Sequence, residues 1–175
     1  MIDIAQRLIE QAPCQAAGVR EWESGADQVG LRWPVEEPPS EHRPPPRTEC
    51  TPLLEAVYSS VHLLELPEDF DQEGSPGYSA ETWRRAIGFL LSLAGALHER
   101  DAIALPRPKI LPAGAGSIDL HWKSSQYELL VNVPANPQLP VEYYGDNARG
   151  QMPIESHCPA TAPDRKLVAW VSLVI

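Results

Sequence analysis

Cysteine is scarce in this chain of 175 residues, and its three copies stand far apart, at Cys14, Cys50 and Cys158. An odd number without a closely spaced pair does not fit a disulfide framework. The spacing also lacks the neighbouring ligands from which structural zinc sites are usually built. We therefore expect reduced thiols, a cytoplasmic location, and no bound metal or other cofactor.

Long apolar runs are missing as well. The first residues, MIDIAQRLIEQAP, include Asp3 and Glu10 and do not have the pattern of a signal peptide. No segment approaches the ~20 apolar residues that a membrane-spanning helix requires. The sequence therefore predicts a protein that has no membrane partner.

Positive charge is in short supply, because 14 lysines and arginines face 24 aspartates and glutamates, for a net charge of −10. Binding to nucleic acid through phosphates needs a basic surface, so we do not expect direct nucleic-acid binding. Most of the excess lies between residues 36 and 73, where ten acids and two arginines give a local charge of −8. A protein with a basic surface would be the natural partner of such a stretch.

A complete catalytic motif is also missing. The glycines of PAGAGS precede a predicted strand and not a helix, so they indicate a hairpin turn, not a dinucleotide site. No serine or cysteine stands in the context of a nucleophile elbow. The best catalytic candidate is His121, which Asp119 or Glu128 could orient as a general base. A hydrolase that uses these residues is one alternative to a binding protein.

Proline, in contrast, is abundant. Six of the 19 prolines fall in residues 34–46, where they favour an extended backbone and remove hydrogen-bond donors. The chain therefore divides into three predicted parts. These are a small helix and hairpin element over residues 1–33, a proline-rich acidic linker or arm over 34–50, and a single α+β domain over 51–175.

Two amphipathic helices give the clearest secondary-structure signals. Thr51 followed by Pro52 is typical of a helix start, and the apolar spacing that continues to Leu66 predicts about four turns. Ser79 can cap a second helix, which begins near Ala80. The last segment, residues 164–175, fits helix or strand, and Asp164 as a possible N-cap favours a helix.

Before this last segment, the spacing of apolar residues changes to two. In SIDLHWK the apolar Ile118, Leu120 and Trp122 alternate with polar residues, and residues 127–133 repeat the pattern after a turn. PKIL and VEYY supply further strands. We predict an α+β fold in which an antiparallel meander of about three to five strands is covered on its apolar face by two or three helices.

The loop PEDFDQEGSPGYS, residues 67–79, joins the two predicted helices. Its acids match the first half of a calcium loop, but the glutamate that should close such a loop is replaced by Ala80. We interpret it as a solvated acidic connector anchored by its aromatic residues, and a calcium-binding structural domain is a further alternative. Four of its residues are candidate contacts for a partner: Asp69, Asp71, Glu73 and Tyr78.

Tyr143 and Tyr144 are neighbours in the last predicted strand, so their rings should point to opposite faces of the sheet. One ring should pack in the core. The other should lie near the surface, where large amphipathic side chains are typical of protein interfaces. The pair completes the set of candidate contact residues.

Three stretches, FDQEGSPGYSAETWRRAIGFL, PRPKILPAGAGSIDLHWKSSQYELLVNVP and YYGDN, resemble in this order a family of small uncharacterised bacterial and archaeal proteins. The resemblance covers roughly residues 67–150. It implies a prokaryotic context but no site residue or ligand, because none is assigned in that family. The chain departs from the family after Ile154, where Glu155 and Ser156 replace its usual Ile-Lys-Gly segment.

These observations favour a non-enzymatic protein that acts through protein contacts. We expect an accessory or inhibitory partner in a prokaryotic toxin-pair or defence system. Its acidic stretch would steer association with a basic surface. The hydrolase and the calcium-binding domain are the alternatives.

Overall fold

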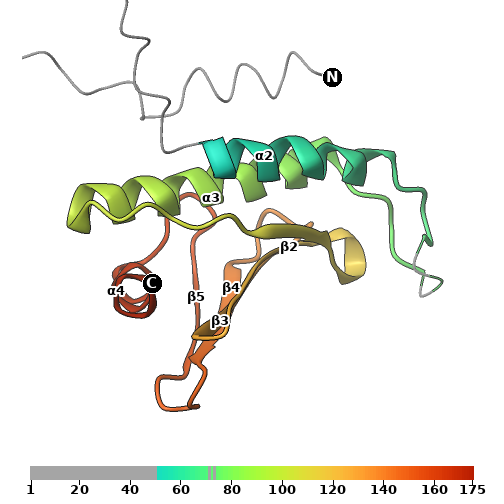
Figure 1. The fold of residues 1–175 in the computed structure, drawn as a ribbon. Helices are drawn as coiled ribbons and strands as arrows, with labels where there is room; N and C mark the ends of the chain where they lie inside the picture. The colour runs from blue at the N-terminus through green and yellow to red at the C-terminus, as the bar shows by residue number, and fades with distance from the viewer. Residues whose placement is uncertain (1–50, 71, 73) are drawn as a thin grey trace, which may run out of the picture.

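A computed structural model describes residues 51–70, 72 and 74–175, and in it an antiparallel sheet carries its helices on one face (Figure 1). The predicted α+β class is confirmed, with five strands and three α-helices in this part of the chain. The parts predicted for residues 1–33 and 34–50 lie outside the described residues, as do Asp71 and Glu73.

The strands follow one another in chain order across the sheet, and each pairs antiparallel with the next. Such a meander forms where short turns join successive strands. The four predicted strands are present, and a fifth was not predicted. Their bounds are β1 Lys109–Pro112, β2 Ile118–Lys123, β3 Tyr127–Val133, β4 Val141–Asn147 and β5 Ile154–Cys158.

The helices are α2 Thr51–Ser59, α3 Ala80–Asp101 and α4 Arg165–Val174. The side chain of Ser79 accepts a hydrogen bond from the Thr82 amide at 3.0 Å, and Asp164 accepts one from the Leu167 amide at 2.7 Å. Both predicted N-caps are therefore confirmed. The last segment, which the pattern left open, is a helix.

The prediction of a single helix of four turns after Thr51 was wrong in one respect. The α-helix ends at Ser59, and a 3-10 helix, η2 Ser60–Glu65, follows it. The Ser60 hydroxyl donates to the Val57 carbonyl at 2.7 Å. Serine side chains that bond to the preceding turn compete with the regular α-helical pattern, which accounts for the change.

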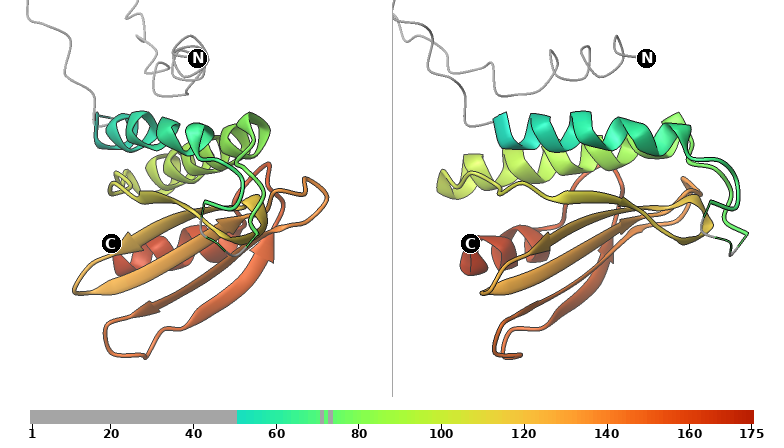
Figure 2. Two further views of the ribbon diagram at one scale, coloured as in Figure 1. Left: turned by 90° about the vertical axis from the view of Figure 1, so that its right-hand side faces the viewer. Right: turned by 45° about the vertical axis from the view of Figure 1, so that its right-hand side comes forward.

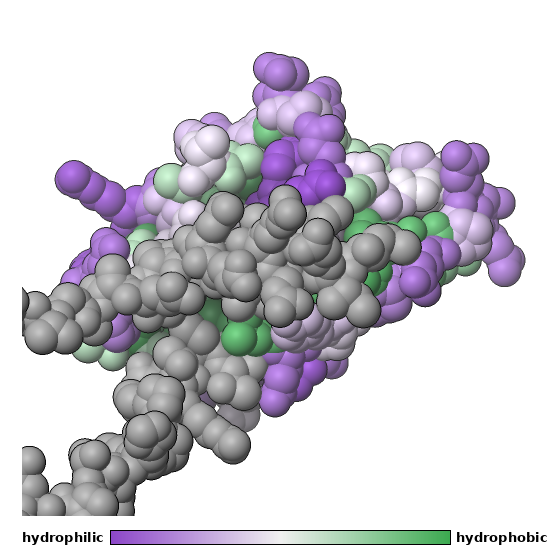
Figure 3. Space-filling view, turned by 90° about the horizontal axis from the view of Figure 1, so that it is seen from above, coloured by the Kyte–Doolittle hydropathy of each residue, from purple (hydrophilic) through white to green (hydrophobic). Residues whose placement is uncertain are grey.

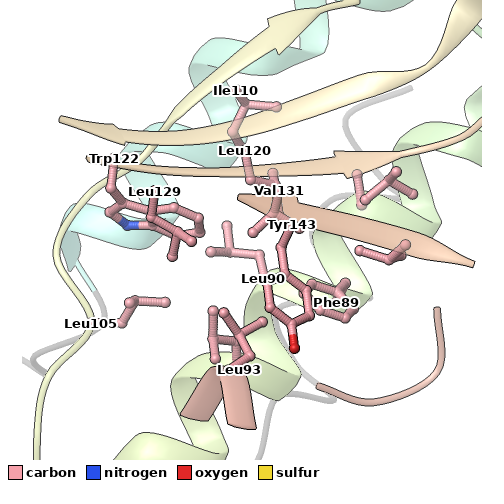
Figure 4. Close-up of a cluster of buried hydrophobic side chains, with 14 of the residues drawn as sticks. Phe89, Leu90, Leu93, Leu105, Ile110, Leu120, Trp122, Leu129, Val131 and Tyr143 are labelled. Carbon is pink, nitrogen blue, oxygen red and sulfur yellow. The ribbon is translucent and has the colours of Figure 1, made fainter. Parts of the chain in front are cut away.

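The core lies between the sheet and α3, the helix predicted to cover the apolar face. Buried residues alternate along β2, β3 and β4, which is the pattern of a sheet with one covered side. Figure 4 shows the side chains of α3 pointing toward those of the strands. Among them are Phe89, Leu90 and Leu93 of α3 and Leu120, Leu129 and Val131 of the sheet.

Each of the three tryptophans among the described residues links two separate segments of the chain through a hydrogen bond. Each indole N–H donates a hydrogen bond: Trp83 to the Ser60 hydroxyl at 2.9 Å, Trp122 to the Pro106 carbonyl at 2.8 Å and Trp170 to the Met152 carbonyl at 2.7 Å. A buried tryptophan contributes a large apolar area, and its one polar group needs a partner. All three tryptophans are buried, and the indole N–H of each has a hydrogen-bond partner.

The helical side of the molecule has hydrophilic residues at its margins and smaller apolar patches between them (Figure 3). Within the described residues, no helix has the length and apolar character needed to span a membrane.

Candidate functional site

No described helix covers the second face of the sheet. In the left view of Figure 2 this face points toward the viewer, and α4 lies behind the sheet. We call this second face the open face. Its side chains alternate along each strand with those of the core. The strand registers arrange them in three rows: Leu111, Asp119, Asn132, Glu142 and His157; Lys109, His121, Leu130, Tyr144 and Glu155; and Lys123, Glu128 and Asp146.

The charges of the open face are unevenly distributed. Its bases, apart from His157, lie on the first two strands, and most of its carboxylates lie on the last three. The open face carries two lysines, Lys109 and Lys123, and five acids. The acids are Asp119, Glu128, Glu142, Asp146 and Glu155.

His121 is held by Glu128, one of the two carboxylates that the sequence offered as its partner. The distance from His121 Nε2 to Glu128 Oε1 is 2.8 Å, and Lys123 Nζ lies 3.0 Å from the other carboxylate oxygen. These hydrogen bonds, first that from Lys123 and then that from His121, lower the pKa of Glu128. The glutamate is therefore an anion between two basic groups.

Asp119, the other residue that the sequence suggested as a partner of His121, is hydrogen-bonded to a different residue. Its Oδ1 accepts a hydrogen bond from Asn132 Nδ2 at 2.7 Å, because the register places Asn132 directly opposite it. Burial raises the pKa of Asp119, and the bond from Asn132 opposes that shift. Of the two predicted arrangements, the structure forms the pair His121 and Glu128.

Among the described residues, no serine, threonine or cysteine side chain is hydrogen-bonded to this pair. In the described part of the chain, the imidazole of His121 makes a single hydrogen bond, to Glu128. Ser117 is bound to Asn132 and Gly114, and Cys158 is a free thiol buried on the covered face. What the arrangement does is orient an imidazole beside a carboxylate, which is how general bases are positioned.

The structure separates the three candidate tyrosines. Tyr143 is 2% exposed and Tyr144 is 51% exposed, so one ring lies in the core and one at the surface, as predicted. Tyr78 is 6% exposed, packs edge-on against Phe70 and donates to the Ala113 carbonyl at 3.1 Å. Because Tyr78 and Tyr143 are buried, the proposal that they contact a partner is corrected. Of the three candidates, Tyr144 is the one that is exposed.

In the acidic loop, Asp69 is exposed and turns the chain. Its Oδ1 accepts from the Gly74 amide at 2.6 Å, and its own amide donates to the Ser75 carbonyl at 2.8 Å. The other two acidic candidates, Asp71 and Glu73, lie outside the described residues. Among residues that are described, no group of three or more His, Cys, Asp or Glu side chains could hold a metal ion.

A hollow of about 320 Å³ lies on the open face beside Tyr144. Residues of β3, β4 and β5 line it, and Glu142, Glu155 and His157 were not predicted as site residues. A second hollow of about 340 Å³ adjoins it, because Asn132 and Glu142 line both. Arg85 of α3 holds the loop beside the second hollow by donating to the Pro134 and Ala135 carbonyls at 2.7 and 2.8 Å.

Glu155 and His157 were missed because β5 was not predicted, whereas Glu142 lies in the predicted strand VEYY but was not singled out as a site residue. The available signal for β5 was weak, because only the two ends of IESHC, Ile154 and Cys158, are apolar.

Comparison of the chain with family models, curated proteins and solved structures gives no match. The resemblance described from the sequence therefore stays a prediction.

Proposed function

We propose that this protein binds another protein through the open face and acts as a non-enzymatic accessory or inhibitory subunit. The observation that carries the proposal is Tyr144, which is 51% exposed on a sheet face that no described helix covers. Exposed tyrosines are enriched at protein interfaces and frequent among their energetic centres. The excess of carboxylates around this ring favours a partner with a basic surface.

The cellular setting that we propose is a cytoplasmic toxin-pair or defence system of a prokaryote. It is supported by the sequence resemblance over residues 67–150 and by the small number of cysteines.

Substitution of Tyr144 by arginine tests the proposal, because it adds a bulky cation where a basic partner would dock. Tyr58→Arg is a matched control, since Tyr58 is 50% exposed but belongs to α2. The full chain and both variants would be used to capture partners from the native host. The captured protein would then be purified and its affinity measured by calorimetry. We expect the wild type and Tyr58→Arg to bind alike and Tyr144→Arg to bind at least about tenfold more weakly. Equal affinity of all three would contradict the proposal.

A hydrolase is the second candidate, and the 2.8 Å hydrogen bond between His121 and Glu128 favours it. A carboxylate that orients an imidazole is a common device of general bases. The full chain would be assayed with chromogenic esters, phosphoesters and amides. Turnover that falls about a hundredfold or more in His121→Ala would establish the enzyme, whereas a binding protein shows no turnover to lose.

A further inference from the structure

We propose that the hollow beside Tyr144 receives an arginine side chain of the partner protein. The guanidinium would lie between the carboxylates of Glu142 and Glu155 and against the tyrosine ring. This inference rests on the proposed protein-binding function and specifies the chemistry of the docking site.

The geometry comes from the register of β4 and β5. Glu142 lies opposite His157, and Tyr144 lies opposite Glu155. The two glutamates therefore occupy diagonal corners of a square, and Tyr144 adjoins both. Side chains at diagonal positions on adjacent strands have Cα atoms about 7–8 Å apart. That separation leaves room for a planar group that bridges the two carboxylates.

Glu142 and Glu155 are also the two acids of the open face whose side chains have no partner in the described part of the chain. Glu128 is bound by His121 and Lys123, and Asp119 by Asn132. Asp146 accepts hydrogen bonds from the amides of Asn147 and Met152. An incoming cation would therefore find its complementary charge at these two glutamates and would break no existing ion pair.

The hollow is small. Its volume of about 320 Å³ is at the low end of the ~300–1,000 Å³ typical of ligand pockets. Leu130 and Asn132 contribute to its lining from β3. The apolar surface of Leu130 can contact the aliphatic part of a long basic side chain, while the charged end remains among the carboxylates.

Arginine suits this site better than lysine. Its planar guanidinium has five N–H donors in a fixed arrangement, stacks on aromatic rings and binds carboxylates through two parallel hydrogen bonds. A cation over a tyrosine face adds a further attraction. The ammonium of lysine is more strongly hydrated and lacks the planar surface for stacking.

The test uses three capped pentapeptides that differ only at the central residue: Ac-Gly-Gly-Arg-Gly-Gly-amide and its lysine and citrulline counterparts. Each would be titrated into the ¹⁵N-labelled full chain and followed by amide chemical shifts. We expect saturable shifts at Leu130, Tyr144, Glu155 and His157 with the arginine peptide. Binding should be weaker with lysine and absent with citrulline, which is uncharged.

Two variants with the same change in charge separate the site from a general charge effect. In Glu142→Gln/Glu155→Gln the arginine peptide should bind at least about tenfold more weakly. In Glu68→Gln/Glu99→Gln, which alters two exposed glutamates elsewhere, binding should be unchanged. Thermal melts would verify that both variants are folded.

Three results would overturn the inference: equal shifts with arginine and citrulline, full binding by the Glu142 and Glu155 variant, or an equal loss in both variants. If any of these occurs while Tyr144→Arg still loses the native partner, the arginine site falls and the protein-binding function stands. If Tyr144→Arg keeps the partner, the proposed function falls as well.

Discussion

Tyr143 and Asp164 connect the middle of the sheet to the start of α4. The Tyr143 hydroxyl donates to Asp164 Oδ2 at 2.9 Å, and Oδ1 of the same carboxylate caps the helix. Burial, and then the nearby Asp164 carboxylate, raise the pKa of Tyr143 to about 12. The hydroxyl therefore remains a donor at alkaline pH.

This pKa predicts how stability depends on alkaline pH. Because the pKa of Tyr143 is raised above its ordinary value of 10.0, its contribution is fully present below about pH 10. It is lost as the pH rises from about 10 to about 12, at up to about 1.4 kcal/mol per pH unit. Tyr143→Phe lacks this ionisation, so its free energy of unfolding should decline less steeply there.

Urea unfolding of both proteins from neutral pH to about pH 12 measures the difference. The thiol of Cys158 and the hydroxyl of Tyr127, whose pKa values burial also raises, are present in both proteins. Parallel declines would show that the Tyr143 hydroxyl does not ionise differently in the folded and unfolded chains.

At the scale of elements, β4 and α4 lie close together at Gly145. A Cβ atom there would lie 2.8 Å from Cη2 of Trp170 and 3.1 Å from the Glu128 carbonyl oxygen. Trp170 is buried and bonded to Met152, so its ring has little freedom to move away. The helix can pack on the sheet here because this residue has no side chain.

We therefore expect Gly145→Ala to lower the free energy of unfolding by about 1–3 kcal/mol through overpacking. Gly88→Ala makes the same chemical change on the exposed side of α3, where nothing lies within 4 Å. That control should raise stability by about 0.5–1 kcal/mol, because alanine favours a helix over glycine. Chemical denaturation of the two variants checks both values, and an equal effect in both would contradict the packing argument.

The connector between η2 and α3 gives a second prediction at this scale. Asp69 already accepts the Gly74 amide, and the position of a closing glutamate is taken by Ala80, the first residue of α3. We expect millimolar calcium to leave the melting temperature of the full chain unchanged relative to magnesium. A rise specific to calcium that disappears in Asp69→Asn would instead support the calcium-binding alternative.

For the whole molecule, the net charge of −10 and the acids of the open face should act together on association. A basic partner would be attracted over about 10 Å at 0.1 M salt but over only about 3 Å at 1 M. The association rate constant should therefore fall as salt increases, and it should fall less for Glu142→Gln/Glu155→Gln. Stopped-flow mixing with the captured partner measures this dependence, and rates that do not change with salt would contradict it.

The sequence by itself determined four of the five described strands, the starts of α3 and α4, and which side chains of β2 and β3 share a face. Helix caps at Ser79 and Asp164 act within one turn, and the alternation in β2 and β3 places successive side chains on opposite faces whatever the strand pairs with. These are local effects of the backbone. They were therefore sufficient for the α+β class and for the expectation that one of two adjacent tyrosines is buried.

The tertiary structure decided what the strands bring together. The strand register, and not distance along the chain, brings His121 within hydrogen-bond distance of Glu128 and Asp119 within hydrogen-bond distance of Asn132. The short and largely polar sequence of β5 becomes a strand by pairing with β4. The tertiary structure also decides that Tyr144, and not Tyr143, is exposed. A shift of one residue would exchange the two faces, so the register is chosen by the packing of the whole core. A local sequence pattern does not report the free energy of packing the whole core, so it could not predict the register.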